Sequence, residues 1–392
     1  MKSAKLMLMN ELYDQSFIDS LPELLPWRNP RVLLVCRSKS NENQKAAIEK
    51  WYASIPDKVK PQFYTRLRSQ DDSQFIPAYY ELVAHQYCVE EGWRVEYEPT
   101  LTKKGNKPDI VVETKRGYKF VLEVATLFDS HGFTRLLASQ QALNQRLSAI
   151  QTDWVLQVHY EASPDTDVKP KVVVAEVTAW LAKLPMTGSH KQLFQSGGYD
   201  IEIEAMMDDE KPSSGCVRAI FSPVISIPDY SKRIASVLNG KRKKFSSKIT
   251  GLPLVIMVGS AADGFNVDSH ALDKALFGHH VLVWGTASTA PAEFQRDRTG
   301  YFTPSYAHGR VIGKNTGISA VLYCSTRNSE TEYSVCFQMQ VFHNPEAHIL
   351  LDEDVFQKMP QLVKTNIDPL GYSMRWVITN PESTAISFII AE

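Results

Sequence analysis

The chain has 392 residues, of which 43% are hydrophobic, and its formal net charge is −1 at pH 7. This composition is that of a globular protein, and at about 150 residues per domain the length predicts two or three domains. No apolar stretch approaches the roughly 18 residues that a membrane-spanning helix needs, so we expect no membrane span. The near-zero net charge excludes a general electrostatic attraction to nucleic acid, so any such binding needs a local basic patch.

The cysteines and the first residues indicate the cellular compartment. The five cysteines form no Cys-x-x-Cys pair, and the short apolar run after Lys5 stops at Asn10. An odd, scattered set of cysteines is typical of reduced thiols, and the apolar run is too short for a secretory signal. We therefore expect a cytoplasmic protein.

Residues 1–72 are expected to form a mainly helical extension, in which Val32 to Cys36 could be one short strand. A core follows over residues 73–162, beginning with a helix that ends at Gly92. The core elements predicted from hydrophobic patterning are a helix at 74–91, strands at 94–98, 109–113 and 118–127, a helix at 134–150 and a strand at 154–160.

Residues 163–392 are expected to form an α/β to β-rich C-terminal region. The predicted elements are a helix at 172–183, strands near 201 and 217, a basic helix at 229–247, and strands at 254–258, 281–284, 318–324, 333–342, 373–378 and 385–390. These strands could extend the sheet of the core, or they could form a separate β-rich domain.

A pair of acidic residues stands out in the core. Two strand-like runs flank the turn Lys115-Arg116-Gly117, which predicts a β-hairpin. Pairing centred on this turn places Asp109 directly opposite Glu123, with Cβ atoms about 5 Å apart. Two carboxylates at that distance repel each other, so we expect a divalent cation between them or a shared proton. A register slip of one residue would instead turn the two acids to opposite faces.

A third acid, Glu81, could join this pair. It lies on the predicted helix at 74–91, in a stripe of small and semi-apolar residues with helical spacing. Glu81 could therefore point inward, toward Asp109 and Glu123. The alternative is that all three acids are exposed or ion-paired at the surface, because Asp and Glu are mostly exposed in proteins.

These acids carry a resemblance to a known family. Glu81 on a helix, Pro108-Asp109 at the start of a strand and Glu123-Val124-Ala125 on the next strand resemble the PD-(D/E)xK nuclease superfamily. The similarity extends to uncharacterised bacterial members in which an Arg-Leu-Arg-Ser segment, here beginning at Arg66, precedes the helix. It covers about residues 74–160.

The resemblance implies a restriction-endonuclease-like α/β core, made of a helix, a three-strand meander, a helix and a strand. It also implies hydrolysis of phosphodiester bonds with Mg²⁺ or Mn²⁺. Asp109 and Glu123 would hold the metal and Glu81 would assist, while the metal activates a water and offsets charge on the phosphate.

The sequence departs from the family where a catalytic lysine is expected, because position 125 is alanine. Lys107 is the first replacement we consider, since it falls opposite Ala125 in the predicted pairing. Lys119 lies close to the turn and is expected to be too far away. A lysine of the basic helix, such as Lys241, is the third candidate. Otherwise the site is inactive and the fold only binds.

Basic residues supply the candidate surface for nucleic acid. The segment from Lys232 to Lys248 is rich in Lys and Arg and has no acidic residue. The residues predicted to contact phosphates are Arg66, Arg68, Lys241, Arg242, Lys243, Lys244 and Lys248. The alternative is a solvated helix face, with the two arginines in surface ion pairs.

The resemblance thus implies a Mg²⁺-dependent endonuclease, expected in the cytoplasm and acting on DNA rather than RNA, and roles in bacterial restriction, phage defence or repair are consistent with it. The substrate class comes from fold-level analogy alone. The alternative is a catalytically inactive nuclease-fold module that binds nucleic acid or a protein partner. The C-terminal region could recognise the target, contact a protein partner or form a homodimer.

Overall fold

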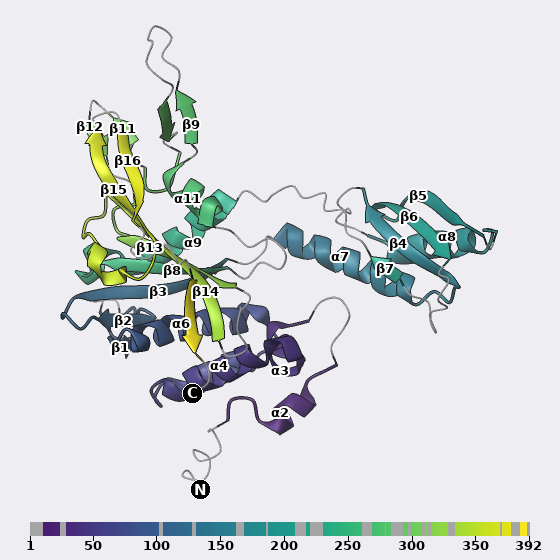
Figure 1. Cartoon of the computed structure of the whole chain (residues 1–392), viewed down its shortest axis with the longest axis horizontal. Helices are drawn as coiled ribbons and strands as arrows, with labels where there is room; N and C mark the ends of the chain where they lie inside the picture. The colour runs from purple at the N-terminus through teal and green to yellow at the C-terminus, as the bar shows by residue number, and fades with distance from the viewer. Residues whose placement is uncertain are drawn as a thin grey trace. The chain divides into compact units, whose positions relative to one another are not determined.

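The structure, a computed structural model, belongs to the mixed α/β class. It describes residues 11–23, 29–101, 105–127, 131–161, 168–185, 187–207, 217–219, 230–260, 269–278, 280–283, 293–296, 299–303, 305–307, 310–312, 315–327, 334–368, 371–377 and 385–389. The chain divides into two compact units, in which unit 2 is Pro26–Arg28 with Asp129–Pro228 and unit 1 is the remainder (Figure 1).

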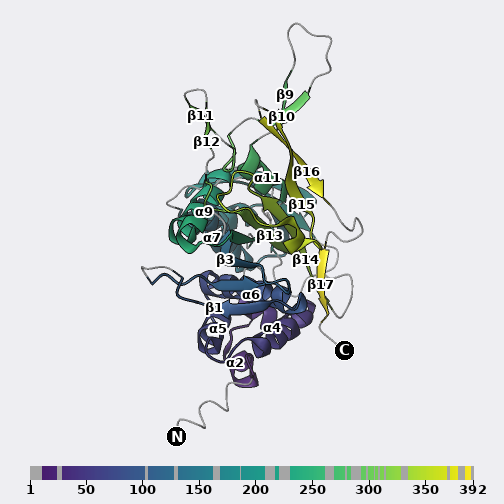
Figure 2. The same ribbon diagram turned by 90° about the vertical axis from the view of Figure 1, so that its left-hand side faces the viewer.

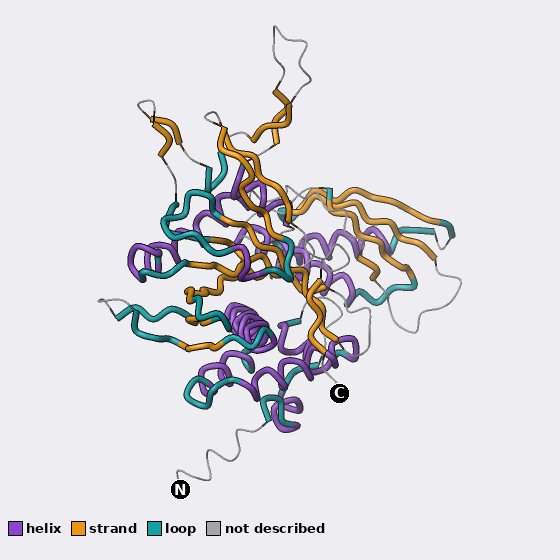
Figure 3. Tube along the Cα trace, turned by 60° about the vertical axis from the view of Figure 1, so that its left-hand side comes forward, coloured by secondary structure: helices purple, strands orange, loops and turns teal. Residues whose placement is uncertain are grey.

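Unit 1 is built on a mixed sheet that has nine strands among the described residues (Figure 3, orange). The order is β1-β2-β3-β8-β13-β14-β15-β16, and β17 also pairs with β14. The strands are β1 (Arg94–Tyr97), β2 (Ile110–Glu113), β3 (Lys119–Leu127), β8 (Leu254–Ser260), β13 (Ala320–Arg327), β14 (Ser334–His343), β15 (Gln361–Asp368), β16 (Gly371–Val377) and β17 (Ala385–Ile389). Strands β8 and β13 to β17 therefore extend the core sheet, which was one of the two alternatives predicted for the strands of the C-terminal region.

Helices cover both faces of this sheet (Figure 2). The helices of one face are α3 (Arg31–Arg37), α4 (Glu42–Ser54), α5 (Lys60–Leu67) and α6 (Asp72–Glu90), and those of the other are α9 (Tyr230–Phe245) and α11 (Ser269–Phe277). Short helices are α2 (Gln15–Ser20), α10 (Ser247–Thr250), η1 (Lys39–Asn41) and η2 (Glu353–Phe356).

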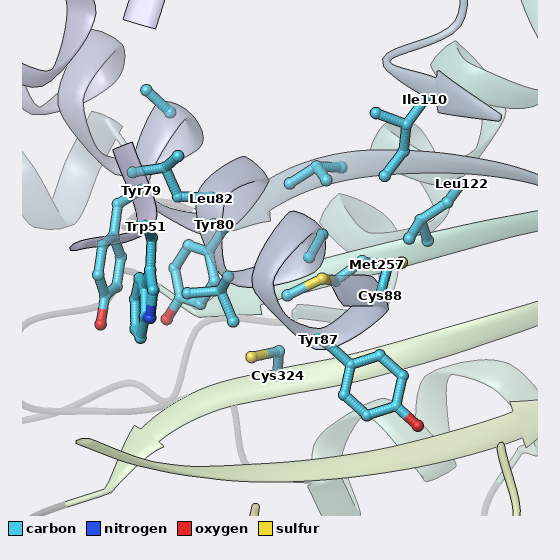
Figure 4. Close-up of a cluster of buried hydrophobic side chains, with 14 of the residues drawn as sticks. Trp51, Tyr79, Tyr80, Leu82, Tyr87, Cys88, Ile110, Leu122, Met257 and Cys324 are labelled. Carbon is cyan, nitrogen blue, oxygen red and sulfur yellow. The ribbon is translucent and has the colours of Figure 1, made fainter. Parts of the chain in front are cut away.

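Strand β8 shows why the sheet has two apolar faces. All of its residues are buried. Met257 packs in the cluster with α4 and α6, where Figure 4 shows it near Cys88 and Leu122. Ile256 and Val258 pack instead in the cluster with α9 and α11. Alternate side chains of a strand point to opposite faces, so a continuous apolar run suits a strand covered on both sides.

The core predicted over residues 73–162 is not the one that forms. The last two elements predicted for this core were a helix and a strand. Both are present, as α7 (His131–Ser148) and β4 (Trp154–Tyr160), but they belong to unit 2. In unit 1 the strand that pairs in parallel with β3 is β8, with Leu122 opposite Val255. The predicted boundaries at 72 and 162 therefore differ from the observed units. Local patterning identified the elements, but it could not indicate which strand pairs with β3.

A second correction concerns Val32 to Cys36, which form helix α3 rather than a strand. Short apolar runs do not distinguish a strand from a buried helix. The backbone N–H of Arg31 donates a 2.7 Å hydrogen bond to Oδ1 of Asp72. A distant side chain thus supplies an acceptor for an N–H of the first turn, which has no partner within the helix. The other elements of the first 72 residues are helical, as predicted.

Unit 2 has its own sheet, of order β5-β6-β4-β7. Its other strands are β5 (Ser189–Ser196), β6 (Tyr199–Met207) and β7 (Val217–Ala219), and α7 and α8 (Pro170–Leu181) are its helices. Its core cluster is separate from the clusters of unit 1. Two further strand pairs in unit 1 are β9 (His280–Val283) with β10 (Glu293–Arg296) and β11 (Ser305–Ala307) with β12 (Arg310–Ile312).

Candidate active site

The hairpin of β2 and β3 brings Asp109 and Glu123 together. The strands are antiparallel, with Ile110 opposite Leu122, so the register predicted from the sequence is confirmed. Asp109 lies one residue before β2, level with Glu123. Its backbone N–H donates to Oε1 of Glu123 at 2.8 Å, and the N–H of Val124 donates to Oδ2 of Asp109 at 2.8 Å. Each carboxylate is therefore oriented by the backbone of the opposite strand.

Lys241 of α9 offsets the charge of these two acids. Its Nζ donates to Oδ2 of Asp109 at 3.0 Å and to Oε2 of Glu123 at 2.7 Å. It reaches them because Ile234, Leu238 and Phe245 pack on the sheet, and residue 241 shares their face of the helix. Of the three predicted replacements for the missing lysine, Lys241 is the one that contacts the acidic pair.

Burial sets the electrostatics of this group. The side chain of Glu123 is fully buried, whereas Asp109 is 28% and Lys241 27% exposed. Burial and the nearby charge of Asp109 raise the pKa of Glu123 to about 7, although Lys241 acts in the opposite direction. Burial acts to lower the pKa of Lys241, but the two carboxylates outweigh it and raise that pKa. Lys241 therefore stays protonated and is a hydrogen-bond donor.

Glu81, the third predicted acid, is paired with Arg66 and not with the other two acids. Nη1 and Nη2 of Arg66 donate to Oε2 and Oε1 of Glu81 at 2.8 and 2.7 Å. Burial raises the pKa of Glu81, which Arg66 counteracts and the charge of Asp109 reinforces. Among the described residues, no group of three or more His, Cys, Asp or Glu side chains is arranged to hold a metal ion. The predicted set of three metal-binding acids is therefore not assembled.

Lys107 and Lys119 do not reach the acidic pair. Lys107 is exposed, and within the described part of the chain no hydrogen bond or ion pair joins it to Asp109 or Glu123. The pairing of β2 with β3 ends at Ile110, so the strand register does not extend to the predicted position of Lys107 opposite Ala125. Lys119 forms an ion pair with Glu113 at 3.3 Å near the turn.

The other predicted phosphate-binding residues fall into two groups. Arg68 forms a 2.8 Å ion pair with Asp14 and lies over the rings of Phe17 and Tyr64, which is the alternative role considered for it. Arg242 is half-buried and donates to Oδ1 of Asn239 at 3.1 Å. The exposed residues are Lys243, Lys244 and Lys248.

Sequence reasoning did not anticipate the pairing of Arg66 with Glu81. The two residues lie on different helices, α5 and α6, and their spacing carries no signal of contact. It also missed the backbone N–H groups of Asp109 and Val124, although the predicted register contained the information to place them.

No family model matches this chain, and no curated protein and no solved structure matches it either. Within the described residues, no helix is both long and apolar enough to cross a membrane. The chemistry of the site must therefore be argued from its own groups, which are two carboxylates, a protonated lysine and an adjacent arginine–glutamate pair.

Proposed function

We propose that this protein is a Mg²⁺- or Mn²⁺-dependent nuclease of the PD-(D/E)xK type that hydrolyses phosphodiester bonds in DNA. The observation that carries the proposal is the contact of Lys241 with both Asp109 and Glu123 at the end of one hairpin. These are the residue types of the family motif, with the lysine supplied by α9 instead of by position 125. A restriction-endonuclease-like core would then consist of α6, β1 to β3, α9 and β8.

The donor set suits a hard divalent cation, which prefers carboxylate oxygens. Oδ2 of Asp109 and Oε2 of Glu123 converge on one cationic group, the Nζ of Lys241, so they could also converge on a metal ion. Asp109 and Glu123 would hold it. When bound, Mg²⁺ would lower the pKa of a water and offset negative charge on the phosphate.

The residues around the metal would orient the reaction. The N–H groups of Asp109 and Val124 keep the two carboxylates in a fixed orientation, which pre-organises the site. The Nζ of Lys241 lies beside both carboxylates, so it would donate a hydrogen bond to the attacking water or to a phosphate oxygen.

The same helix supports binding of the nucleic-acid backbone. Lys243 and Lys244 follow Lys241 on α9 but are exposed, and Lys248 is exposed on α10. Contacts from such side chains to phosphates add affinity without sequence information. The proposal extends to roles in restriction, phage defence or repair, which would all require a DNA nuclease.

Cleavage of plasmid DNA, single-stranded DNA and RNA with Mg²⁺ or Mn²⁺ tests the proposal. We expect the wild type to cleave DNA. Asp109→Ala, Glu123→Ala and Lys241→Ala should each reduce the rate by about 10²-fold or more, because each removes a group that acts on the transition state. Lys107→Ala and Lys119→Ala are the matched controls and should retain activity.

Two outcomes would contradict the proposal. Cleavage that survives the Asp109 and Glu123 substitutions would place the activity elsewhere. A wild type that binds DNA and does not cleave it would favour the inactive binding module.

A further inference from the structure

We infer that the site takes a single divalent cation, held by Asp109 and Glu123, and that Arg66 is a positioning residue that keeps Glu81 away from the metal. The inference rests on the proposed function and deepens it, because two-metal sites, with ions about 3.5–4 Å apart, are a common alternative for phosphodiester hydrolysis.

The first argument is the geometry of the arginine–glutamate pair. Both carboxylate oxygens of Glu81 accept hydrogen bonds from Arg66, at 2.7 and 2.8 Å. Two-pronged, charge-assisted pairs of this kind are among the stronger and more directional polar contacts in proteins. The side chains are only 25% and 18% exposed. Moving Glu81 onto a metal would leave a largely buried guanidinium without its partner, which is costly.

The second argument is the layering of the fold. Glu81 lies on α6, whose neighbouring residues Leu82 and Val83 pack in the core on the α4 side of the sheet. Lys241 comes from α9 on the opposite face, and Glu123 turns toward that helix. The acids thus approach the end of the hairpin from two layers. This agrees with the absence of a common metal-binding set of acids among the described residues.

The third argument is charge. The guanidinium of Arg66 is close enough to Asp109 for their attraction to contribute to the raised pKa of Arg66. Arg66 thus supplies positive charge beside Asp109, where a second cation would otherwise be attracted. Arg66 neutralises Glu81. Lys241 already supplies one positive charge to Asp109 and Glu123. One divalent cation therefore leaves no excess negative charge to attract a second.

Counting bound Mn²⁺ on the full chain tests the inference, by calorimetric titration and by electron paramagnetic resonance of the free ion. We expect one Mn²⁺ per wild-type chain. Glu81→Gln should leave the count at one, because that side chain does not touch the metal, and the Kd should change only through the Arg66 charge that the substitution leaves without its partner. Asp109→Asn and Glu123→Gln should weaken binding more than tenfold, because each removes a charged ligand.

Replacing the arginine gives the more specific result. Arg66→Met frees the Glu81 carboxylate, so a second Mn²⁺ should bind. A purely structural role for Arg66 would leave the count at one. Arg68→Met is the matched control from the same segment, since Arg68 pairs with Asp14, and its count should stay at one. If Arg66→Met fails to fold, the Mn²⁺ counts of the wild type and of Glu81→Gln still test whether the site takes a single ion that Glu81 does not hold.

The outcomes separate this inference from the proposed function. Two Mn²⁺ on the wild type, or no bound Mn²⁺ in Glu81→Gln, would overturn the single-metal inference and leave a metal-dependent nuclease intact. A wild type that neither binds Mn²⁺ nor cleaves DNA would remove the proposed function and this inference with it.

Discussion

Lys241 lies 118 residues after Glu123 in the sequence, yet its Nζ is 2.7 Å from Oε2 of that residue. Glu123 is fully buried, so the lysine offsets a carboxylate that water cannot reach. Burial raises the pKa of Glu123, and the negative charge of Asp109 raises it further. At the residue scale, we expect the contacts that carry the proposed chemistry to stabilise the fold without metal as well.

A stability measurement checks this dual role. Lys241→Met keeps most of the side-chain volume and removes the charge, so we expect the free energy of unfolding to fall by about 2 kcal/mol. The loss should stay below the 3–5 kcal/mol typical of a fully buried broken pair, because Lys241 is 27% exposed.

Urea unfolding without divalent ions measures the effect. Lys243→Met is the control on the same helix, where the side chain is exposed, and a change below about 0.5 kcal/mol is expected. Equal stability of Lys241→Met and wild type would show that the ion pair contributes nothing to folding.

At the scale of elements, helix α6 packs closely against strand β8 at a glycine of the strand. The ring of Tyr80 on α6 packs directly over Gly259 of β8, where an added Cβ would overlap the ring, and its hydroxyl donates to the carbonyl of Ser260 at 2.6 Å. The glycine thus permits the close approach of α6 to the strand. The position of this helix matters for the site because α6 also carries Glu81.

A pair of glycine substitutions tests this packing. Gly259→Ala should lower the free energy of unfolding by about 2 kcal/mol, because the fully packed ring of Tyr80 has to move. Gly240→Ala on α9 is the matched control, since a Cβ there meets nothing within 4 Å. Alanine is the better helix former, so that variant should gain about 0.5–1 kcal/mol.

Thermal or urea unfolding of both variants gives the comparison. The packing argument would be wrong if the two substitutions shifted stability in the same direction.

At the scale of the whole molecule, unit 2 is inserted in the sequence between two elements of unit 1 that carry the site. Strand β3 with Glu123 ends at Leu127, and α9 with Lys241 begins at Tyr230. Among the residues that the structure describes, the core clusters of unit 1 consist of residues of unit 1 and the core cluster of unit 2 consists of residues of unit 2. The insertion explains why the core order predicted over contiguous residues does not hold.

Removal of the insertion tests whether unit 1 folds independently. A chain in which a flexible linker of about 20 residues, rich in Gly and Ser, replaces residues 129–228 should unfold cooperatively, because it keeps both of its hydrophobic clusters. Circular dichroism during urea unfolding provides the measurement. A broad, non-cooperative transition would mean that unit 1 depends on the insertion.

The sequence by itself determined the local features of this protein. The hairpin register that aligns Asp109 with Glu123 could be predicted because a short turn and the two-residue repeat of strands define it. Most of the main helices and strands followed from apolar periodicity. Weakly patterned strands such as β5, which is largely polar, did not, and Val32 to Cys36 were assigned to the wrong type of element.

Only the tertiary structure decided which distant elements meet. That β8 pairs with β3, that Lys241 rather than Lys107 contacts the acids, and that Arg66 holds Glu81 all depend on contacts between segments far apart in the chain. Such contacts follow from the packing of whole apolar faces, as on α9, and periodicity within one segment carries no information about its partner. The sequence therefore revealed the acidic pair, but it offered Lys241 only as one of several lysines that could contact this pair.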